Sequence, residues 1–494
     1  MRLAAYTAPA YDLIEPAERA RLTSADPRSI AHLTLPTFGA EDAAARLAAW
    51  RADGTFTVES AAALYVYDLA GPGPEPSTRG WVGAVALAPP TVVAPHEATV
   101  AAVVADRRAL RAATHADLEP VVFAHGGPPG PAAALAAQIV AARPPDADLT
   151  DDVGVRHRLW RVADPAELAT VRADLARRHA VIADGHHRWA AATRPPDSAG
   201  LGDSPAAARQ AAVSGAAVAP ARTATAGDAA GRPGSRGGES GGGESGGATS
   251  SGAGSGGVTP GGAGSGGAAS SGAGSARAAS PDAVACGAAG LGAGSAGGKG
   301  SGSAGSAGGE GSGGIGSAAA ADAAAGRVLA LVVPAGEHGP QVRAIHRVLP
   351  GTTLDRLDVR RFRSAEVGPL TAAGAEELLA ATTRLLVLAT DGERWWRLTE
   401  PDAATVAPAA WRELPVGLVD VLLVGERAVV LRHSVAAALD EARRSGGVAL
   451  LVPATPTATV LDLAARGVLM PRKSTFFVPK PRTGLVLRCF ADQP

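Results

Sequence analysis

The amino-acid sequence predicts a mixed α/β fold that is interrupted by a long insertion. Short apolar runs with strand character, such as Ala62–Asp68, alternate along the chain with patterns typical of helices, such as Glu41–Arg51. A tract dominated by Gly, Ser and Ala occupies residues 197–325, and large apolar residues are nearly absent from it. Such a composition cannot bury enough surface to offset chain entropy, so we expect the tract to be disordered.

The first part of the chain, residues 1–196, contains both kinds of element. Strands are expected at Ala62–Asp68 and Trp81–Leu87, and the Gly/Pro-rich loop between them suggests a hairpin. Helices are expected at Glu41–Arg51, Ala105–Ala116 and Pro165–Arg178, where apolar residues recur at helical spacing.

The last part, residues 326–494, is predicted to complete the same fold. A long loop adds closure entropy only logarithmically, so an insertion of this length is tolerable within one fold. A linker between two independent domains is the weaker alternative. The expected elements are strands at Val328–Ala335, Arg394–Leu398, Val429–His433, Gly447–Val452 and within Phe476–Phe490, helices at Val435–Arg444 and Val460–Ala465, and a helix running into a strand at Ala372–Val387.

Composition narrows the functional classes. The chain has 494 residues and a formal net charge of −1, so bulk charge gives no reason to expect a nucleic acid or a membrane as partner. Its two cysteines, Cys286 and Cys489, form no disulfide framework, which suits a cytoplasmic location. No apolar run approaches the ~20 residues of a membrane span, and no signal peptide is evident. A homo-oligomer is compatible with the sequence.

The segment HAVIADGHHRWAAA, residues 179–192, is the most informative part of the chain. Val181 and Ile182 indicate a buried strand, Asp184-Gly185 a tight turn, and His187 onward a helix. A strand, turn and helix in this order leave backbone N–H groups free at a helix N-terminus, which favours anions. The five residues 184–188 include four with polar or charged side chains, namely Asp184, His186, His187 and Arg188. The alternative is an ordinary helix cap followed by a solvated first turn.

Other segments also carry candidate polar groups. In PHEAT, residues 95–99, His96 and Glu97 interrupt an apolar run; a solvated loop is the alternative. In RKST, residues 472–475, a rare lysine is followed by two hydroxyls, a combination that binds phosphate or a carboxylate; a basic turn is the alternative. His346 and Arg347 lie on an apolar strand, where alternation places them on opposite faces.

ADGHHR, residues 183–188, is similar to the phosphate-binding turn of the ParB/sulfiredoxin-like superfamily, and most similar to its free-serine kinases. The remainder resembles a bacterial family, domain of unknown function 1015. The motifs that carry this resemblance, in order, are APAYDLIEPAER (Ala8–Arg19), DPRSIAHLTLP (Asp26–Pro36), RGWVGAVAL (Arg79–Leu87), the long segment Ala94–Phe123, LWRVADP (Leu159–Pro165), VRAIHRVL (Val342–Leu349) and MPRKSTFFVPKPRTGLVLR (Met470–Arg488).

The resemblance implies a ParB/sulfiredoxin-like core with additional α/β elements. It also implies a small-molecule kinase that transfers a phosphoryl group from ATP, ADP or pyrophosphate to a hydroxylated metabolite such as L-serine, with Mg²⁺. The expected catalytic residues are Glu97, Asp184 and His186, with Asp184 also the expected metal ligand. The expected phosphate- and substrate-binding residues are His96, Thr99, Arg107, Gly185, His187, Arg188, His346, Arg347, Lys473, Ser474 and Thr475.

The sequence departs from these patterns in two places. Ile345 precedes His346-Arg347 where the family usually has Thr, and the low-complexity tract replaces the segment after the GHHR helix. Two alternatives therefore stay open: a ParB-like nucleotide-binding regulatory module, and a phosphatase or nucleotide hydrolase that uses the same site. Sulfiredoxin-like chemistry is disfavoured because no cysteine lies near Asp184–Arg188.

Overall fold

The computed structural model describes residues 2–73, 77–193, 284–286, 290–291, 326–382, 385–402 and 409–492. The predicted mixed α/β fold is confirmed. The tract predicted to be disordered lies outside the described residues, except for two short strands that were not expected, β10 (Val284–Cys286) and β11 (Gly290–Leu291). No described helix is long and apolar enough to cross a membrane.

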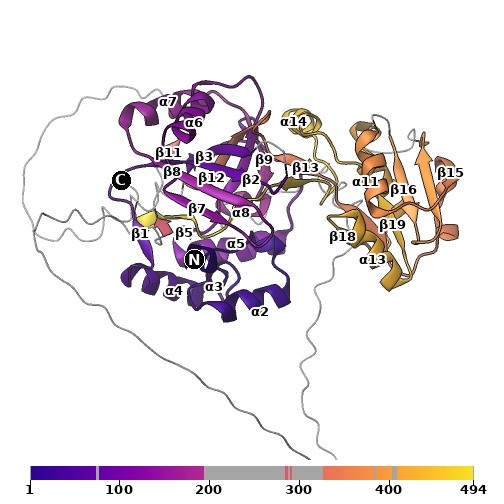
Figure 1. Cartoon of the computed structure of the whole chain (residues 1–494), viewed down its shortest axis with the longest axis horizontal. Coiled ribbons are helices and arrows are strands. Elements are labelled where there is room, and N and C mark those ends of the chain that lie inside the picture. The colour runs from indigo at the N-terminus through magenta and orange to yellow at the C-terminus, as the bar shows by residue number, and fades with distance from the viewer. Residues whose placement is uncertain are drawn as a thin grey trace, which may run out of the picture. The chain divides into compact units, whose positions relative to one another are not determined.

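A nine-stranded sheet is the largest of the described sheets, and helices lie around it (Figure 1). Strand β12, from the last part of the chain, lies between β6 and β3, so residues on both sides of the insertion share this sheet. Its order is β4 (Val93–Ala94), β9 (Ala180–Asp184), β6 (Val121–His125), β12 (Arg327–Pro334), β3 (Thr78–Ala86), β2 (Leu64–Ala70), β8 (Arg156–Val162) and β7 (Ala147–Thr150), with β11 paired to β3.

Both faces of this sheet are buried because helices cover each of them (Figure 1). Side chains alternate between the two faces along β2, and Leu64 and Val66 lie on the face that packs against α6 (Pro131–Ala142) and α7 (Pro165–Leu175). Tyr65, Tyr67 and Leu69, on the opposite face of β2, pack into the core that includes α4 (Ala40–Ala52) and α5 (Ala101–Thr114). The predicted hairpin of β2 and β3 is confirmed, with antiparallel pairing from Tyr65–Val82 to Leu69–Thr78.

A second sheet has six strands and carries α11 (Ala372–Ala381) and α13 (Val435–Ser445) in its apolar core. Its order is β15 (Arg363–Val367), β17 (Trp395–Thr399), β16 (Val387–Thr390), β19 (Val448–Leu451), β14 (His346–Leu349) and β18 (Val430–Arg432). Two small sheets pair β13 (Gln341–Arg343) with β20 (Phe476–Val478), and β1 (Phe56–Val58) with β10, β21 (Val486–Cys489) and β5 (Ala116–Asp117). The other α-helices among the described residues are α1 (Arg2–Tyr6), α2 (Pro16–Ala25), α3 (Ala31–Thr34), α8 (His186–Thr193), α12 (Pro415–Val419) and α14 (Thr457–Ala465).

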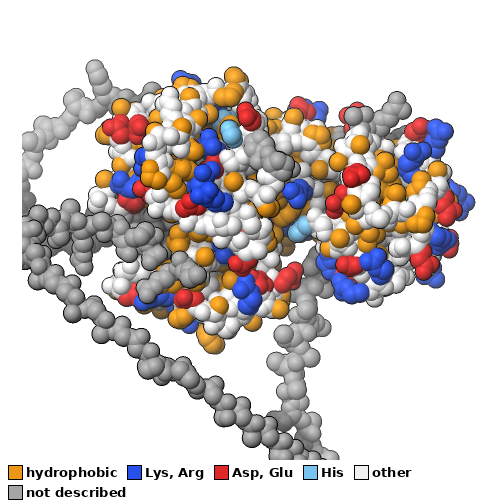
Figure 2. All heavy atoms as spheres, viewed as in Figure 1, with side chains coloured by type: hydrophobic (Ala, Val, Ile, Leu, Met, Phe, Trp, Pro, Cys, Tyr) orange, Lys and Arg blue, Asp and Glu red, His pale blue; other side chains and the backbone are white. Residues whose placement is uncertain are grey.

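The predicted helices exist, but their ends differ. Helix α5 begins at Ala101, four residues before the expected Ala105, and α7 ends at Leu175 instead of Arg178. Basic and acidic side chains are interspersed on the face shown in Figure 2, which agrees with the near-zero net charge.

Candidate functional site

A cavity of about 530 Å³ brings together segments that are far apart in the sequence. It is large enough for a small-molecule substrate. The residues predicted as site residues that line it are His96, Glu97, Asp184, Gly185, His186, His187, Arg188, Lys473 and Thr475. The cavity therefore joins the PHEAT loop, the ADGHHR turn and the RKST loop.

The ADGHHR turn positions its side chains by a sharp change of backbone direction. Strand β9 ends at Asp184, α8 begins at His186, and Gly185 between them has a φ of +91°. Only glycine adopts this region readily. A Cβ atom at this position would also lie 2.9 Å from Nη2 of Arg188. Glycine therefore allows the guanidinium to fold back over the turn.

Replacement of Gly185 by Ala is expected to lower the free energy of unfolding by about 1–3 kcal/mol, because strained φ and steric overlap add. Urea denaturation measures this change. The matched control is Gly54→Ala, where φ is +76° but an added Cβ would have nothing within 4 Å. Equal losses in both variants would show that the contact with Arg188 contributes nothing.

His186 and His187 hold the PHEAT loop through their Nε2 atoms. The backbone N–H of His96 donates to Nε2 of His186 (3.4 Å), and that of Val100 donates to Nε2 of His187 (3.0 Å). Both imidazoles therefore carry their proton on Nδ1 when neutral. Burial lowers the pKa of His187 to about 4 and that of His186 well below its ordinary value. Neither ring is suited to taking up a proton near neutral pH.

The PHEAT and RKST loops are joined by backbone and side-chain hydrogen bonds. The N–H of Met470 donates to the carbonyl of His96 (2.7 Å), and the N–H of Lys473 donates to Oε2 of Glu97 (2.9 Å). His96 donates from Nδ1 to the carbonyl of Ile182 (2.7 Å), so its Nε2 accepts from the hydroxyl of Thr475 (2.8 Å). His96 thus links the PHEAT loop to β9 and to the RKST loop.

Glu97 has an environment suited to a general base. Burial raises the pKa of its carboxyl, and the positive charges of Lys473 and Arg472 only partly oppose this effect. A base is most effective when its pKa approaches the working pH. One carboxylate oxygen is held by the Lys473 N–H, which fixes the orientation of the group.

Asp184 is held between two cations. Lys480 Nζ lies 2.7 Å from Oδ1 of Asp184, and Arg188 Nη2 lies 2.7 Å from Oδ2. Burial alone would raise the pKa of Asp184, but the charges of Lys480 and Arg188 outweigh it and hold the pKa well below its ordinary value. Asp184 is therefore a weak base whose two oxygens are already paired, so the expectation that it acts as a proton acceptor does not fit this geometry.

The predicted metal role of Asp184 does not fit its contacts either. Both carboxylate oxygens already face cations, and a Mg²⁺ ion would have to displace them. No group of three or more metal-ligating side chains occurs among the residues that the structure describes. Asp184 instead positions Lys480 and Arg188.

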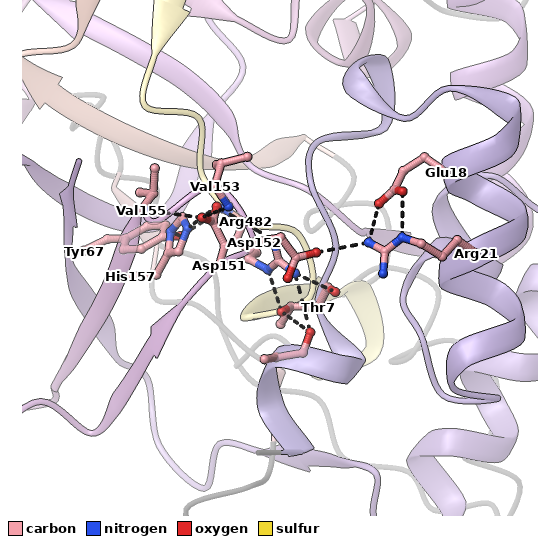
Figure 3. Close-up of polar contacts among 11 residues, drawn as sticks. Thr7, Glu18, Arg21, Tyr67, Asp151, Asp152, Val153, Val155, His157 and Arg482 are labelled. Atoms are coloured by element: carbon pink, nitrogen blue, oxygen red, sulfur yellow. Dashed lines mark hydrogen bonds and ion pairs between the residues drawn. The ribbon is translucent and has the colours of Figure 1, made fainter. Parts of the chain in front are cut away.

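The C-terminal segment that carries Lys480 is anchored by a buried polar network (Figure 3). Two residues beyond Lys480, Nε of Arg482 donates to the Thr7 hydroxyl (2.8 Å), and its backbone N–H donates to the Tyr67 hydroxyl (2.9 Å). The Tyr67 hydroxyl also bonds Nδ1 of His157 (2.8 Å). This network links β2, β8 and the N-terminal segment to the wall of the cavity.

Five of the predicted site residues do not line the cavity. Arg347 pairs with Asp420 (2.9 Å) and donates to the carbonyl of Lys473 (3.1 Å), so it supports the RKST loop from behind. Arg107 stacks on the Tyr11 ring, 4.6 Å from its centroid. The other three predicted residues outside the cavity are Thr99, His346 and Ser474. Thr99 is exposed. Nδ1 of His346 accepts from the N–H of Val452, and the hydroxyl of Ser474 donates to the carbonyl of Pro471.

Several cavity residues were not predicted as site residues. Lys480 and Asp12 form an ion pair (2.7 Å) inside the wall, and the His433 ring stacks on Phe476 with centroids 4.3 Å apart. Tyr11 and Arg472 are further polar members of this set, and the apolar members are Leu13, Val100, Val103, Ala183, Ile345, Leu431 and Phe477. The chain has only three lysines, so the rarity that singled out Lys473 applied equally to Lys480.

The buried histidines make stability depend on pH. Burial lowers the pKa of both His96 and His187 from 6.5 to about 4. The unfolded chain therefore binds more protons than the folded chain between these values, so the free energy of unfolding should fall as pH decreases from 6.5 to 4. Urea denaturation at several pH values measures this slope, which should be smaller in His187→Gln. A flat profile would contradict the neutral, buried state of these rings.

Two solved structures share some likeness with the chain. A conserved hypothetical protein from Pyrococcus furiosus has 15% identity and a TM-score of 0.22, covering 32% of this chain and 67% of its own. A mutant free serine kinase in complex with AMP has 10% identity and a TM-score of 0.31, covering 87% of this chain and 98% of its own. At these TM-scores neither likeness bears on the chemistry of this chain. No curated protein matches it.

The family comparison covers the part of the chain that holds the PHEAT loop and the ADGHHR turn. Residues 1–208 match the model of the family described as protein of unknown function (DUF1015), which confirms the resemblance predicted from the motifs.

Proposed function

We propose that the cavity is the active site of a phosphotransferase that moves a phosphoryl group from ATP, ADP or pyrophosphate to a hydroxylated metabolite such as L-serine. The observation that carries this proposal is the meeting of Glu97, Lys473 and the N-terminus of α8 in one cavity. These groups supply a base, a cation and backbone donors, which are among the parts that phosphoryl transfer uses. The partner in this proposal is a small molecule, and the place of action is the cytoplasm.

The phosphate end of the donor would lie between α8 and the RKST loop. Lys473 is exposed and forms no ion pair with any other described residue, so its ammonium is available to a phosphate. Helix α8 directs its free first-turn N–H groups and its positive dipole end toward the same cavity. Nδ1–H of His186 and His187 can add donors, since their Nε2 atoms are occupied.

Glu97 is the proposed general base. Its carboxylate would take the proton from the acceptor hydroxyl while the hydroxyl oxygen attacks the terminal phosphorus. The new P–O bond forms as the P–O bond to the leaving phosphate breaks, and the leaving group departs with that electron pair. Arg188 and Lys480 are paired with the carboxylates of Glu119, Asp184 and Asp12, so this cluster stabilises the wall of the cavity and leaves Lys473 as the cation available to the phosphate. No step is assigned to a metal, because Asp184 does not fit as its ligand.

³¹P NMR tests the proposal directly. Purified protein is incubated with L-serine and Mg²⁺, with ATP, ADP or pyrophosphate in separate samples. The proposal predicts a phosphoserine signal with at least one donor, and its loss in Lys473→Ala. Breakdown of the donor without phosphoserine, at the same rate with and without L-serine, would overturn the kinase assignment in favour of hydrolysis. No consumption of any donor by the folded protein would overturn phosphotransfer to serine altogether.

A further inference from the structure

A second cavity of about 320 Å³ lies at the other end of the β6–β9 pair. Asp184, in the first cavity, pairs with Val122 near the start of β6, whereas His125 pairs with Ala180 at the opposite end. The second cavity opens where the parallel strands β6 and β12 both end, at His125 and Pro334. Carboxyl ends of adjacent parallel strands are frequent ligand sites in α/β proteins.

The walls of this cavity are mostly apolar. Trp81 and Val332 come from the sheet, and Ala133 and Leu175 come from α6 and α7. The deep polar groups are already paired: Nε1 of Trp81 donates to the carbonyl of Ala132 (3.0 Å), and Asp174 accepts from the Ala132 N–H and from Arg178. Arg79 is held by Asp68 at 2.8 Å. Glu337, at the rim, is exposed.

His125 is the exception among the deep polar groups; His338, which also lines the cavity, is only half-buried, and its Nδ1 bonds the carbonyl of Ser77 (2.8 Å). His125 is only 5% exposed and lines the cavity. Nδ1 of His125 lies 3.2 Å from the carbonyl oxygen of Gly126, which can only accept, so Nδ1 carries the proton. Nε2 is therefore an unprotonated acceptor, and no described residue donates to it. Burial also lowers the pKa of His125, which keeps the ring neutral beside Arg178.

We infer that this cavity binds a small uncharged compound that has an apolar ring and one hydroxyl or ring N–H, which donates to Nε2 of His125. The apolar walls favour a ring over a sugar or an amino acid, because charged and multiply polar groups would lose hydration without partners. The single buried acceptor favours a ligand with a donor over a pure hydrocarbon, since an unmatched acceptor is costly. This site is independent of the proposed phosphotransferase activity.

Isothermal titration calorimetry with indole tests the inference, with indene as the matched probe that lacks the N–H group. We expect indole to bind the full-length protein with one-to-one stoichiometry and a dissociation constant no weaker than ~1 mM. Indene should bind ~5–100-fold more weakly, because it leaves Nε2 unpaired. Failure of indole to bind, or equal affinities for the two probes, would overturn the inference.

Two variants locate the binding. His125→Phe should remove the preference for indole over indene, and Ala133→Leu should abolish binding of both by filling the cavity from a half-buried helix position. Thermal unfolding confirms that each variant is folded, and Lys473→Ala, in the other cavity, should leave indole affinity unchanged. Indole binding that survives in the folded Ala133→Leu variant, or that is lost in Lys473→Ala, would place the ligand elsewhere and overturn the assignment.

Discussion

Replacement of Glu97 by Gln is expected to lower kcat for phosphoryl transfer by ~10²–10⁴-fold, because the acceptor hydroxyl loses its general base. The amide keeps an oxygen that can accept the N–H of Lys473, so the contact between the two loops should survive. The affinity for the donor should therefore change little. Initial rates and calorimetric titration of the donor separate these two effects.

The pH dependence of the reaction gives an independent check on Glu97. Burial raises the pKa of its carboxyl, so the base form is lost at a higher pH than for an ordinary glutamate. The rate of the wild-type protein should rise with pH through this raised pKa and then level off, and Glu97→Gln should remove that limb. Glu337→Gln, at an exposed carboxylate outside this cavity, is the matched control. Retention of near-wild-type kcat by Glu97→Gln would exclude Glu97 as the base.

Replacement of Lys480 by Met is expected to lower the free energy of unfolding by about 3–5 kcal/mol, because it removes one partner from a buried charge cluster. The Lys480 side chain is 8% exposed, and its ammonium lies 2.7 Å from both Asp12 and Asp184. Burial would lower the pKa of Lys480, but the two carboxylates raise it overall, so the group stays charged. Without it, Arg188 would be the one cation within ion-pair distance of Asp184 among the residues that the structure describes.

A double-mutant cycle separates this charge effect from loss of packing. Urea denaturation of Lys480→Met, Asp184→Asn and the double variant gives the coupling free energy. The double variant should be less destabilised than the sum of the single variants, since it leaves no unpaired carboxylate at residue 184. Strict additivity would contradict the assignment of Asp184 and Lys480 to one coupled pair.

The local parts of this structure were accessible from sequence because they depend on short-range chemistry. The β9 strand, the Gly185 turn and α8 follow from β-branched residues, a glycine and a helical run that are contiguous in the chain. The hairpin of β2 and β3 has the same origin. Helix ends were less accurate because tertiary contacts, such as the hydrogen bond from Arg178 to the carbonyl of Pro128 (3.1 Å), decide where a last turn stops.

The charge pairing inside the cavity could not be deduced in the same way. Asp184 lies four residues before Arg188 in sequence, but its second partner, Lys480, comes from near the C-terminal end of the sequence. Arg347 was expected to bind phosphate or substrate. Its guanidinium is instead paired with Asp420 and donates to the carbonyl of Lys473, so Arg347 supports the RKST loop. Residue type and spacing show which groups can do chemistry, whereas only the fold shows which of them are already neutralised.

Binding of donor phosphates between α8 and the RKST loop underlies the proposed function, and selective [¹⁵N]lysine labelling tests it without relying on turnover. The chain has three lysines, so the amide spectrum should contain three lysine signals, assigned with Lys299→Arg, Lys473→Arg and Lys480→Arg variants. Addition of pyrophosphate, ADP or ATP should shift the Lys473 amide, which is bonded to Glu97, most strongly, and the Lys480 amide next. The Lys299 signal should not move. A spectrum unchanged at saturating concentrations of every donor, or equal shifts of all the lysines, would contradict phosphate binding at this site.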